Sequence, residues 1–184
     1  MRHSARFLLF FIGLFLSLSS AVFPAREADD ADAAYAYAVG YLDSGDFRQA
    51  IASYAKVIAL DPKNAKAYHG RGVAYAQNGQ TKPAIADLTK ALELDPGFAK
   101  AYRNRGLARM QAGDPQGSLE DLSRAIALSP KDAEAYEQRS AARMRAGDRA
   151  GARSDVDEAI RLDSYRGSAY GRRAKLRLAQ GDAA

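Results

Sequence analysis

The chain has 184 residues, of which 47% are apolar and 27% are charged, as in a soluble globular protein. This composition excludes a disordered tail, a collagen-like fibre and a polytopic membrane protein. The absence of cysteine excludes disulfides, thiolate zinc sites, iron–sulfur clusters and thiol catalysis. The only histidines, His3 and His69, are too few for a multi-histidine metal centre. We therefore expect no metal and no cofactor.

The first 21 residues have the pattern of a secretory signal peptide. Residues 1–6 carry two arginines and no acid, residues 7–16 form an apolar run, and Ser19 and Ala21 are small residues suited to a cleavage site. We expect cleavage near Ala21 and export, most simply to the periplasm of a bacterium. The alternative is an uncleaved membrane anchor, although the apolar stretch is shorter than the roughly 20 residues that usually span a bilayer.

The net charge does not favour nucleic acid as a partner. The chain has 27 basic and 22 acidic side chains, for a charge of +5, and removal of residues 1–21 leaves 25 − 22 = +3. Binding through phosphates usually needs a clear basic face. Phosphate-loop, dinucleotide and zinc-protease motifs are also missing from the sequence.

After the signal segment, the sequence repeats with a period of 34 residues. Five glycines have this spacing: Gly45, Gly79, Gly113, Gly147 and Gly181. Four tyrosines and three prolines share it: Tyr68, Tyr102, Tyr136, Tyr170, Pro62, Pro96 and Pro130. A unit of this length accommodates two short antiparallel helices and two turns, so we expect a stack of helix pairs.

The second unit illustrates the expected pair. Helix A is predicted over residues 65–78 and ends at Gly79, where a left-handed residue closes the last turn. Thr81 is expected to cap helix B, and Pro83 lies in its first turn, where a missing N–H costs nothing. Small residues on both helices predict that the helices approach closely: Gly72, Ala76, Ala84 and Ala91. The predicted buried apolar stripe consists of Ile85, Leu88, Leu92 and Leu94.

This pattern resembles the tetratricopeptide repeat family, whose unit has an aromatic, a small residue, an aromatic, alanine, an aromatic or leucine, alanine and proline at set places. The second unit has these as Tyr68, Gly72, Tyr75, Ala84, Leu88, Ala91 and Pro96. The resemblance covers about residues 31–184. It implies an all-α, right-handed α-solenoid of stacked helix-turn-helix units. Arginines take the second aromatic place in later units, as Arg109, Arg143 and Arg177, and this predicts less tight packing there.

The resemblance divides the chain into four repeats with an extra segment at each end. The repeats are residues 31–64, 65–98, 99–132 and 133–166, after a short lead-in over residues 22–30. Residues 167–184 are expected to form a C-terminal capping helix. Its basic residues make it either a wettable cap or a docking patch for an acidic partner, and they are Arg172, Arg173, Lys175 and Arg177.

Three arginines stand sixteen residues before three aspartates. We predict ion pairs that join helix A to helix B in repeats two, three and four: Arg71–Asp87, Arg105–Asp121 and Arg139–Asp155. Repeat one has Tyr37 and Ser53 at the two places, so it lacks both partners together. The arginines are therefore interpreted as structural rather than as a phosphate site, and the tyrosines as packing between repeats.

The resemblance implies that helix A of each repeat lines a concave groove. The second, fifth, sixth, ninth and thirteenth residues of each repeat are then the candidate contacts with a peptide or protein partner. These include Tyr35, Lys66, His69, Gln77, Lys100, Arg103, Asn104, Gln111 and Gln138. They vary between repeats, as a recognition surface does, but exposed positions also vary by drift.

Asn104 is the best single candidate, because an amide can bond an extended peptide backbone while Lys100 and Arg103 hold a carboxylate. Asn104 and Arg103 are expected to be exposed. His69 is expected to be an exposed surface histidine or, alternatively, a ligand contact. Some family members grip a chaperone's C-terminal carboxylate with a lysine and asparagine clamp, but no register of this chain supplies that set.

No catalytic site is expected. Glu134 and Glu137 share one helical face, but exposed carboxylate pairs on helices are common, and no other acid–base or nucleophilic arrangement is present. Two functions remain. The first is an exported interaction module that binds a peptide or protein in its groove. The second is a structural subunit of an envelope complex or a homo-oligomer, which associates through its ends or convex surface.

Overall fold

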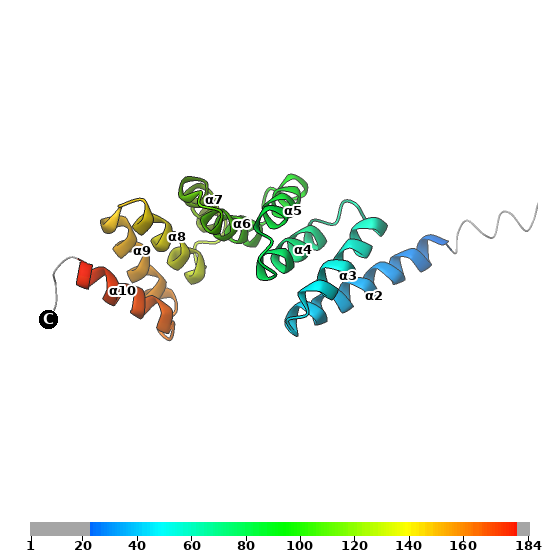
Figure 1. Ribbon diagram of the computed structural model, residues 1–184, viewed down its shortest axis with the longest axis horizontal. Coiled ribbons are helices and arrows are strands. Elements are labelled where there is room, and N and C mark those ends of the chain that lie inside the picture. The colour runs from blue at the N-terminus through cyan, green and yellow to red at the C-terminus, as the bar shows by residue number, and fades with distance from the viewer. Residues whose placement is uncertain (1–22, 180–184) are drawn as a thin grey trace, which may run out of the picture. The chain divides into compact units, whose positions relative to one another are not determined.

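The computed structural model describes residues 23–179, with side chains from residue 30 to residue 178. All regular elements in this range are α-helices (Figure 1). They are α2 (Phe23–Asp43), α3 (Phe47–Leu60), α4 (Ala65–Gln77), α5 (Thr81–Leu94), α6 (Ala99–Gln111), α7 (Pro115–Leu128), α8 (Ala133–Arg145), α9 (Arg149–Leu162) and α10 (Gly167–Ala179). The predicted signal peptide lies outside the described residues.

The ends of the helices follow from their turn residues. Gly79 and Gly113 have φ angles of 75° and 83°, in the left-handed region that glycine adopts without strain. Asp114 caps α7 by accepting a hydrogen bond from the Gly117 N–H, and Pro115 is the first helical residue, as predicted. The predicted Thr81 cap is wrong. Thr81 is already helical, and Gln80 holds the cap position with no side-chain hydrogen bond.

The described chain divides into two compact units, and the first ends at Lys63. In this unit α2 packs along α3, and Ala38, Ala50 and Tyr54 are buried. Helix α2 begins at Phe23, so most of the expected lead-in belongs to the first helix. No glycine interrupts residues 23–39, and Pro24 lies in the first turn, which tolerates proline.

The second unit begins at Asn64 and contains α4 to α10. Each helix packs against the next along the chain, and the A helices also contact one another, α4 with α6 and α6 with α8. This is the packing of an all-α solenoid, in which each pair of helices rests on its neighbours. None of the helices in residues 23–179 combines the length and apolar character that crossing a membrane requires.

The two helices of a repeat cross at a small residue. A Cβ atom on Gly72 would lie 2.8 Å from Leu88 Cγ, so only glycine fits at this crossing. Gly106 stands in the same relation to Leu122, at 2.9 Å. In repeat four the place is taken by Ser140, which is buried and donates a 2.8 Å hydrogen bond to the Ala152 carbonyl.

Three of the four repeated tyrosines, Tyr68, Tyr102 and Tyr136, pack against buried clusters, as predicted, whereas Tyr170 is 39% exposed. Tyr102 contacts the buried cluster that includes Leu88 and Leu92 of the preceding repeat. It also contacts the cluster formed by Ala125, Ile126 and Ala135. Because one ring bridges two clusters, the tyrosine series stabilises the stack rather than presenting a surface for bases.

Candidate protein-interaction surface

The candidate contacts lie on helix A of successive repeats. We number places within each 34-residue repeat from residues 31, 65, 99, 133 and 167. The A-helix face is defined as places 2, 5, 6, 9 and 13 of α4, α6, α8 and α10. The structure shows which of these side chains bind other residues of the protein and which are exposed and without a partner among the described residues.

The three predicted ion pairs are present. Arg71 Nε lies 2.7 Å from Asp87 Oδ2, and the second carboxylate oxygen accepts from Nη2 at 2.9 Å. Arg105 and Arg139 make the same bidentate contact with Asp121 and Asp155, each at 2.7 Å. The hydrogen bonds that Arg71 donates to Asp87 raise the pKa of Arg71 above its ordinary value. These arginines join helices A and B and are not a phosphate site.

A second arginine reinforces two of these pairs. Arg109 Nη1 lies 3.1 Å from Asp121 Oδ2 and also donates to the Gly117 carbonyl at 3.2 Å. Arg143 does the same with Asp155 and Gly151, at 2.9 and 3.0 Å. Arginine at the second aromatic place therefore does not loosen these repeats, because it bonds helix B where an aromatic ring would pack.

In repeats three and four a glycine follows the second arginine by eight residues, a spacing that was not used to predict these contacts. A Cβ atom on Gly117 would first meet the carboxylate of the capping Asp114 and would also lie 3.1 Å from Arg109 Cδ. One on Gly151 would likewise meet Asp148 and lie 3.0 Å from Arg143 Cδ. The arginine stem passes over this glycine to reach the aspartate. Repeat two has a tyrosine at the arginine place and Pro83 at the glycine place, so the two residue types occur together.

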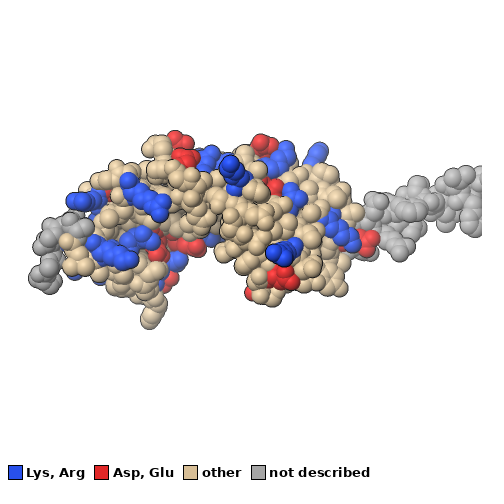
Figure 2. All heavy atoms as spheres, viewed as in Figure 1, with Lys and Arg blue, Asp and Glu red and all other residues tan. Residues whose placement is uncertain are grey.

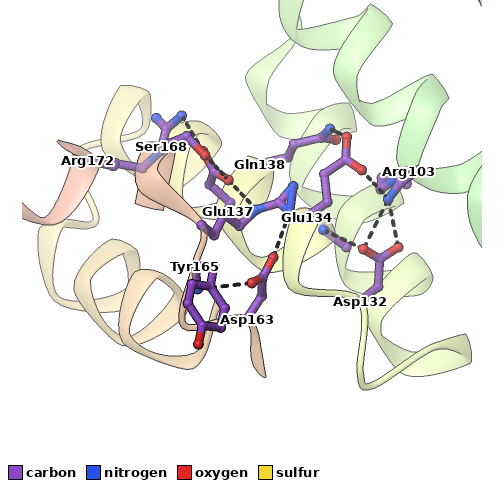
Figure 3. Close-up of polar contacts among 11 residues, drawn as sticks. Arg103, Asp132, Glu134, Glu137, Gln138, Asp163, Tyr165, Ser168 and Arg172 are labelled. Atoms are coloured by element: carbon purple, nitrogen blue, oxygen red, sulfur yellow. Dashed lines mark hydrogen bonds and ion pairs between the residues drawn. The ribbon is translucent and has the colours of Figure 1, made fainter. Parts of the chain in front are cut away.

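Place 5 of helix A contacts place 34 of the same repeat in all three complete repeats of the second unit. In repeat three, Arg103 Nη1 lies 3.1 Å from each carboxylate oxygen of Asp132 (Figure 3). In repeat four the charges are exchanged, and Arg166 Nε donates to Glu137 Oε2 at 2.7 Å. In repeat two the pair is aromatic, His69 and Phe98, with ring centroids 4.7 Å apart.

Further bonds extend this contact across repeats three and four. Arg103 also pairs with Glu134 at 2.6 Å, and Glu134 in turn accepts from Gln138 at 3.0 Å (Figure 3). Glu137 accepts from Ser168 of α10 at 2.9 Å. Glu134 and Glu137 therefore bind different internal partners and do not form a carboxylate pair directed at a common substrate.

The expectation that Arg103 and Asn104 are exposed is wrong. The Arg103 side chain is only 17% exposed, because it is held between Asp132 and Glu134. Asn104 is half-buried and its Nδ2 lies 2.9 Å from His69 Nε2 of the preceding repeat. Both residues link helices, so neither is a free contact for a ligand.

The expectation of an exposed His69 is also wrong. The pKa of His69 is lowered to about 4, chiefly by burial and to a smaller extent by the nearby charges of Lys100 and Arg103. The neutral ring can then accept the hydrogen bond from the Asn104 amide. His69 is a packing residue between α4 and α6.

In α4 and α6, the open part of the A-helix face lies at places 2 and 13, together with place 9 of α6. Lys66 and Lys100 at place 2 are exposed, as are Gln77 and Gln111 at place 13. Leu107 at place 9 is 38% exposed. Within the described residues these side chains have no hydrogen-bond or ion-pair partner. In the first unit, Tyr35 instead packs edge-on against Tyr54, with centroids 5.8 Å apart.

No metal centre is built on the described part of the chain, where histidine and carboxylate side chains do not gather in groups of three or more suited to a metal ion.

Comparisons with known sequences match the repeat units found above. A TPR repeat model matches residues 41–79, and two tetratricopeptide repeat models match residues 65–98 and 99–132. The chain contains tetratricopeptide repeats. The last two matches coincide with the boundaries of repeats two and three. A search of curated proteins finds no match.

Solved structures with the same repeat fold are similar to this chain. A crystal structure of MamA protein has 27% identity and a TM-score of 0.74, with 84% of each chain covered. Pilf from Pseudomonas aeruginosa has 22% identity and a TM-score of 0.77, over 85% of this chain and 71% of that one. The first tetratricopeptide domain of Spaghetti (RPAP3), bound to an HSP90 peptide, has 25% identity and a TM-score of 0.63, over 66% and 96%.

Proposed function

We propose that the protein is an exported interaction module that binds a peptide or protein partner on its A-helix face. Tetratricopeptide repeats support a protein–protein interaction module in general. The observation that carries the choice of surface is the set of exposed side chains at places 2 and 13 of α4 and α6 and at place 9 of α6. Every place-5 residue of these repeats is bonded internally, so recognition is assigned to the open places.

The chemistry of these places indicates the kind of partner. Lys66 and Lys100 offer two ammonium groups on successive A helices, α4 and α6, and both are exposed. Leu107 offers an apolar contact, while Gln77 and Gln111 offer amides that can bond a peptide backbone. A peptide with an acidic group followed by an apolar side chain complements this order. The HSP90 peptide bound to the RPAP3 domain supports a peptide ligand in general.

The proposed binding is tested by capture with paired variants. The variant Lys100→Glu with Leu107→Asp changes two open residues of α6. Arg124→Glu makes a similar charge reversal on α7, at an exposed position of helix B. A partner that the unaltered protein and Arg124→Glu capture, and that the α6 variant loses at equal folded content, supports the proposal. Equal capture by all three proteins contradicts it and favours a structural subunit that associates through other surfaces.

We also propose that residues 1–21 direct export to the bacterial periplasm and are then removed. The basic start, apolar run and small residues of this segment support the proposal. N-terminal sequencing of the protein recovered from the envelope fraction of an expressing bacterium tests it. A start near Val22 is expected, whereas a protein that keeps Met1 and stays with the cytosol contradicts the proposal.

A further inference from the structure

Helix α10 is a helix A whose outer side is not covered by a helix B in the described structure. We define this outer side by places 4, 7, 8 and 11, which are Tyr170, Arg173, Ala174 and Arg177. On its other side α10 packs against α9, where Leu176 contacts buried Ala152 and Val156. In every earlier repeat of the second unit, the outer side of helix A is covered by helix B of the same repeat.

Repeats three and four show what this side binds. The arginines at places 7 and 11 converge on a single aspartate of helix B. In repeat three, Arg105 and Arg109 both contact Asp121, whose side chain is 4% exposed. In repeat four, Arg139 and Arg143 both contact Asp155, which is 3% exposed. Helix α10 has the same arginine pair as Arg173 and Arg177.

Arg173 is already held in the orientation that its counterparts adopt. Its guanidinium lies over the Tyr170 ring, 5.0 Å from the centroid, as Arg105 lies over Tyr102 at 5.6 Å. Its Nη1 contacts Asp157 of the preceding helix B at 3.6 Å, at the place where Nη1 of Arg105 bonds Thr89. Within the described residues, the Nε and Nη2 groups that bind aspartate in repeats two to four have no partner.

The side chains on the outer side of α10 are also more exposed than their counterparts in repeats three and four. The Arg173 side chain is 31% exposed, against 13% for Arg105 and 15% for Arg139. Ala174 is exposed, although the matching small residues Gly106 and Ser140 are buried under helix B. The basic side chains grouped over the C-terminal helices are visible on the left of Figure 2.

The helices that bind such a side share a sequence pattern. In α7 it is Gly117, Ser118, Asp121, Leu122 and Ala125, and α9 repeats it from Gly151 to Ala159. The glycine leaves room for the capping aspartate and for the second arginine, the small residue after it allows the close crossing, and the second aspartate receives both guanidinium groups. The apolar residue after the aspartate is buried in both helices.

We propose that the outer side of α10 binds a helix of a partner protein that carries this pattern: glycine, then serine or alanine, an aspartate four residues after the glycine, a leucine or valine, and alanine. Charge complementarity selects the partner, because α10 itself carries no carboxylate, and Asp157 meets only Nη1 of Arg173, at 3.6 Å. The site is separate from the A-helix face and does not depend on the function proposed for that face.

A helical peptide with the sequence of residues 114–129 tests the proposal. A lactam bridge between positions 120 and 124, which are exposed in α7, holds the peptide helical, with lysine placed at position 124. The fluorescein-labelled peptide is titrated with the purified protein, and its anisotropy is measured. We expect saturable binding that weakens at least tenfold with Arg173→Gln, with Arg177→Glu, or with Asp121→Asn in the peptide.

Lys175→Glu is the matched control, because it changes the charge of α10 on its other side. We expect less than a twofold effect from it, and we expect Arg173→Gln and peptide Asp121→Asn together to lose little more than either alone. Absence of binding, or equal losses in Lys175→Glu and Arg177→Glu, overturns the proposal. Self-association of the protein alone that Arg177→Glu abolishes also overturns it, since a second copy is then the occupant.

Discussion

Asp121 and Asp155 each hold two guanidinium groups, whereas Asp87 holds one. Asp121 bonds Arg105 through both oxygens and Arg109 through one, while Asp87 bonds Arg71 alone. Loss of a buried carboxylate leaves its basic partners with uncompensated charge, which is more costly than the net worth of the pair. The cost should therefore follow the number of arginines that each aspartate neutralises.

We predict that Asp121→Ala lowers the free energy of unfolding by about 3 kcal/mol and Asp87→Ala by about 2 kcal/mol. The smaller value reflects the single partner and the greater exposure of Asp87. Urea titration followed by circular dichroism measures both. Equal losses below about 0.5 kcal/mol would show that the arginines are satisfied by water instead.

His69 makes stability depend on pH. Its pKa is lowered to about 4, chiefly by burial, while the unfolded chain has the ordinary value near 6.5. Between these values the unfolded state binds a proton that the folded state does not. The stabilising effect of a neutral His69 is therefore complete above pH 6.5 and is lost as the pH falls toward 4.

We predict a loss of about 2 kcal/mol in the free energy of unfolding from this group between pH 7 and pH 4.5. His69→Gln keeps a side chain that can bond Asn104 but does not titrate. The difference between the two proteins in urea titrations at the two pH values isolates the histidine. An identical pH dependence in both proteins would place the ring in solvent.

At the scale of helices, the residues at place 5 and place 34 contact each other in repeats two, three and four, although the residue types differ. The three versions are His69 with Phe98, Arg103 with Asp132, and Glu137 with Arg166. Place 34 lies at or just before the start of the next helix A. The contact therefore joins each helix A to the start of the next helix A.

We predict that Glu137→Arg alone destabilises the protein by about 3 kcal/mol, because it sets a second buried cation against Arg166. Adding Arg166→Asp copies the arrangement of repeat three and should restore more than half of the loss. The single and double variants form a double-mutant cycle measured by urea unfolding. Additive effects would show that the two places do not interact.

Glycine has opposite roles in two A helices of the second unit. A Cβ atom at Gly72 would press on Leu88, while one at Gly171 meets nothing within 4 Å. We predict that Gly72→Ala costs about 1–3 kcal/mol through overpacking. Gly171→Ala should stabilise by about 0.5–1 kcal/mol through helix propensity. Thermal unfolding of the two variants would contradict this account if both midpoints moved in the same direction.

Much of the helical framework could be predicted because its signals recur with one period. The 34-residue spacing located the turn glycines and the helix pairs, and the sixteen-residue spacing located Arg105–Asp121 and its equivalents. The place-5 contacts could not be found in this way, since their residue types change from repeat to repeat. Only opposite charges 29 residues apart, as in Arg103 and Asp132, gave a signal. For the same reason Arg103 and Asn104 were mistaken for free ligand contacts.

At the scale of the molecule, the repeats use their side chains in two ways. Residues that bridge helices are bonded internally, including several that a search for a binding site would choose first. The open residues of α4 and α6 are Lys66, Lys100, Leu107, Gln77 and Gln111. The proposed function depends on this division, because a partner can bind the open places without breaking an internal contact.

The most direct test is photo-crosslinking in living cells. A photoreactive phenylalanine analogue is placed at Leu107 on the A-helix face or, as the control, at Arg124 on α7, and adducts are identified by mass spectrometry. The account predicts a defined adduct with one partner from position 107 and none from position 124. The same adduct from both positions, or an adduct from position 124 alone, would contradict recognition through the A-helix face.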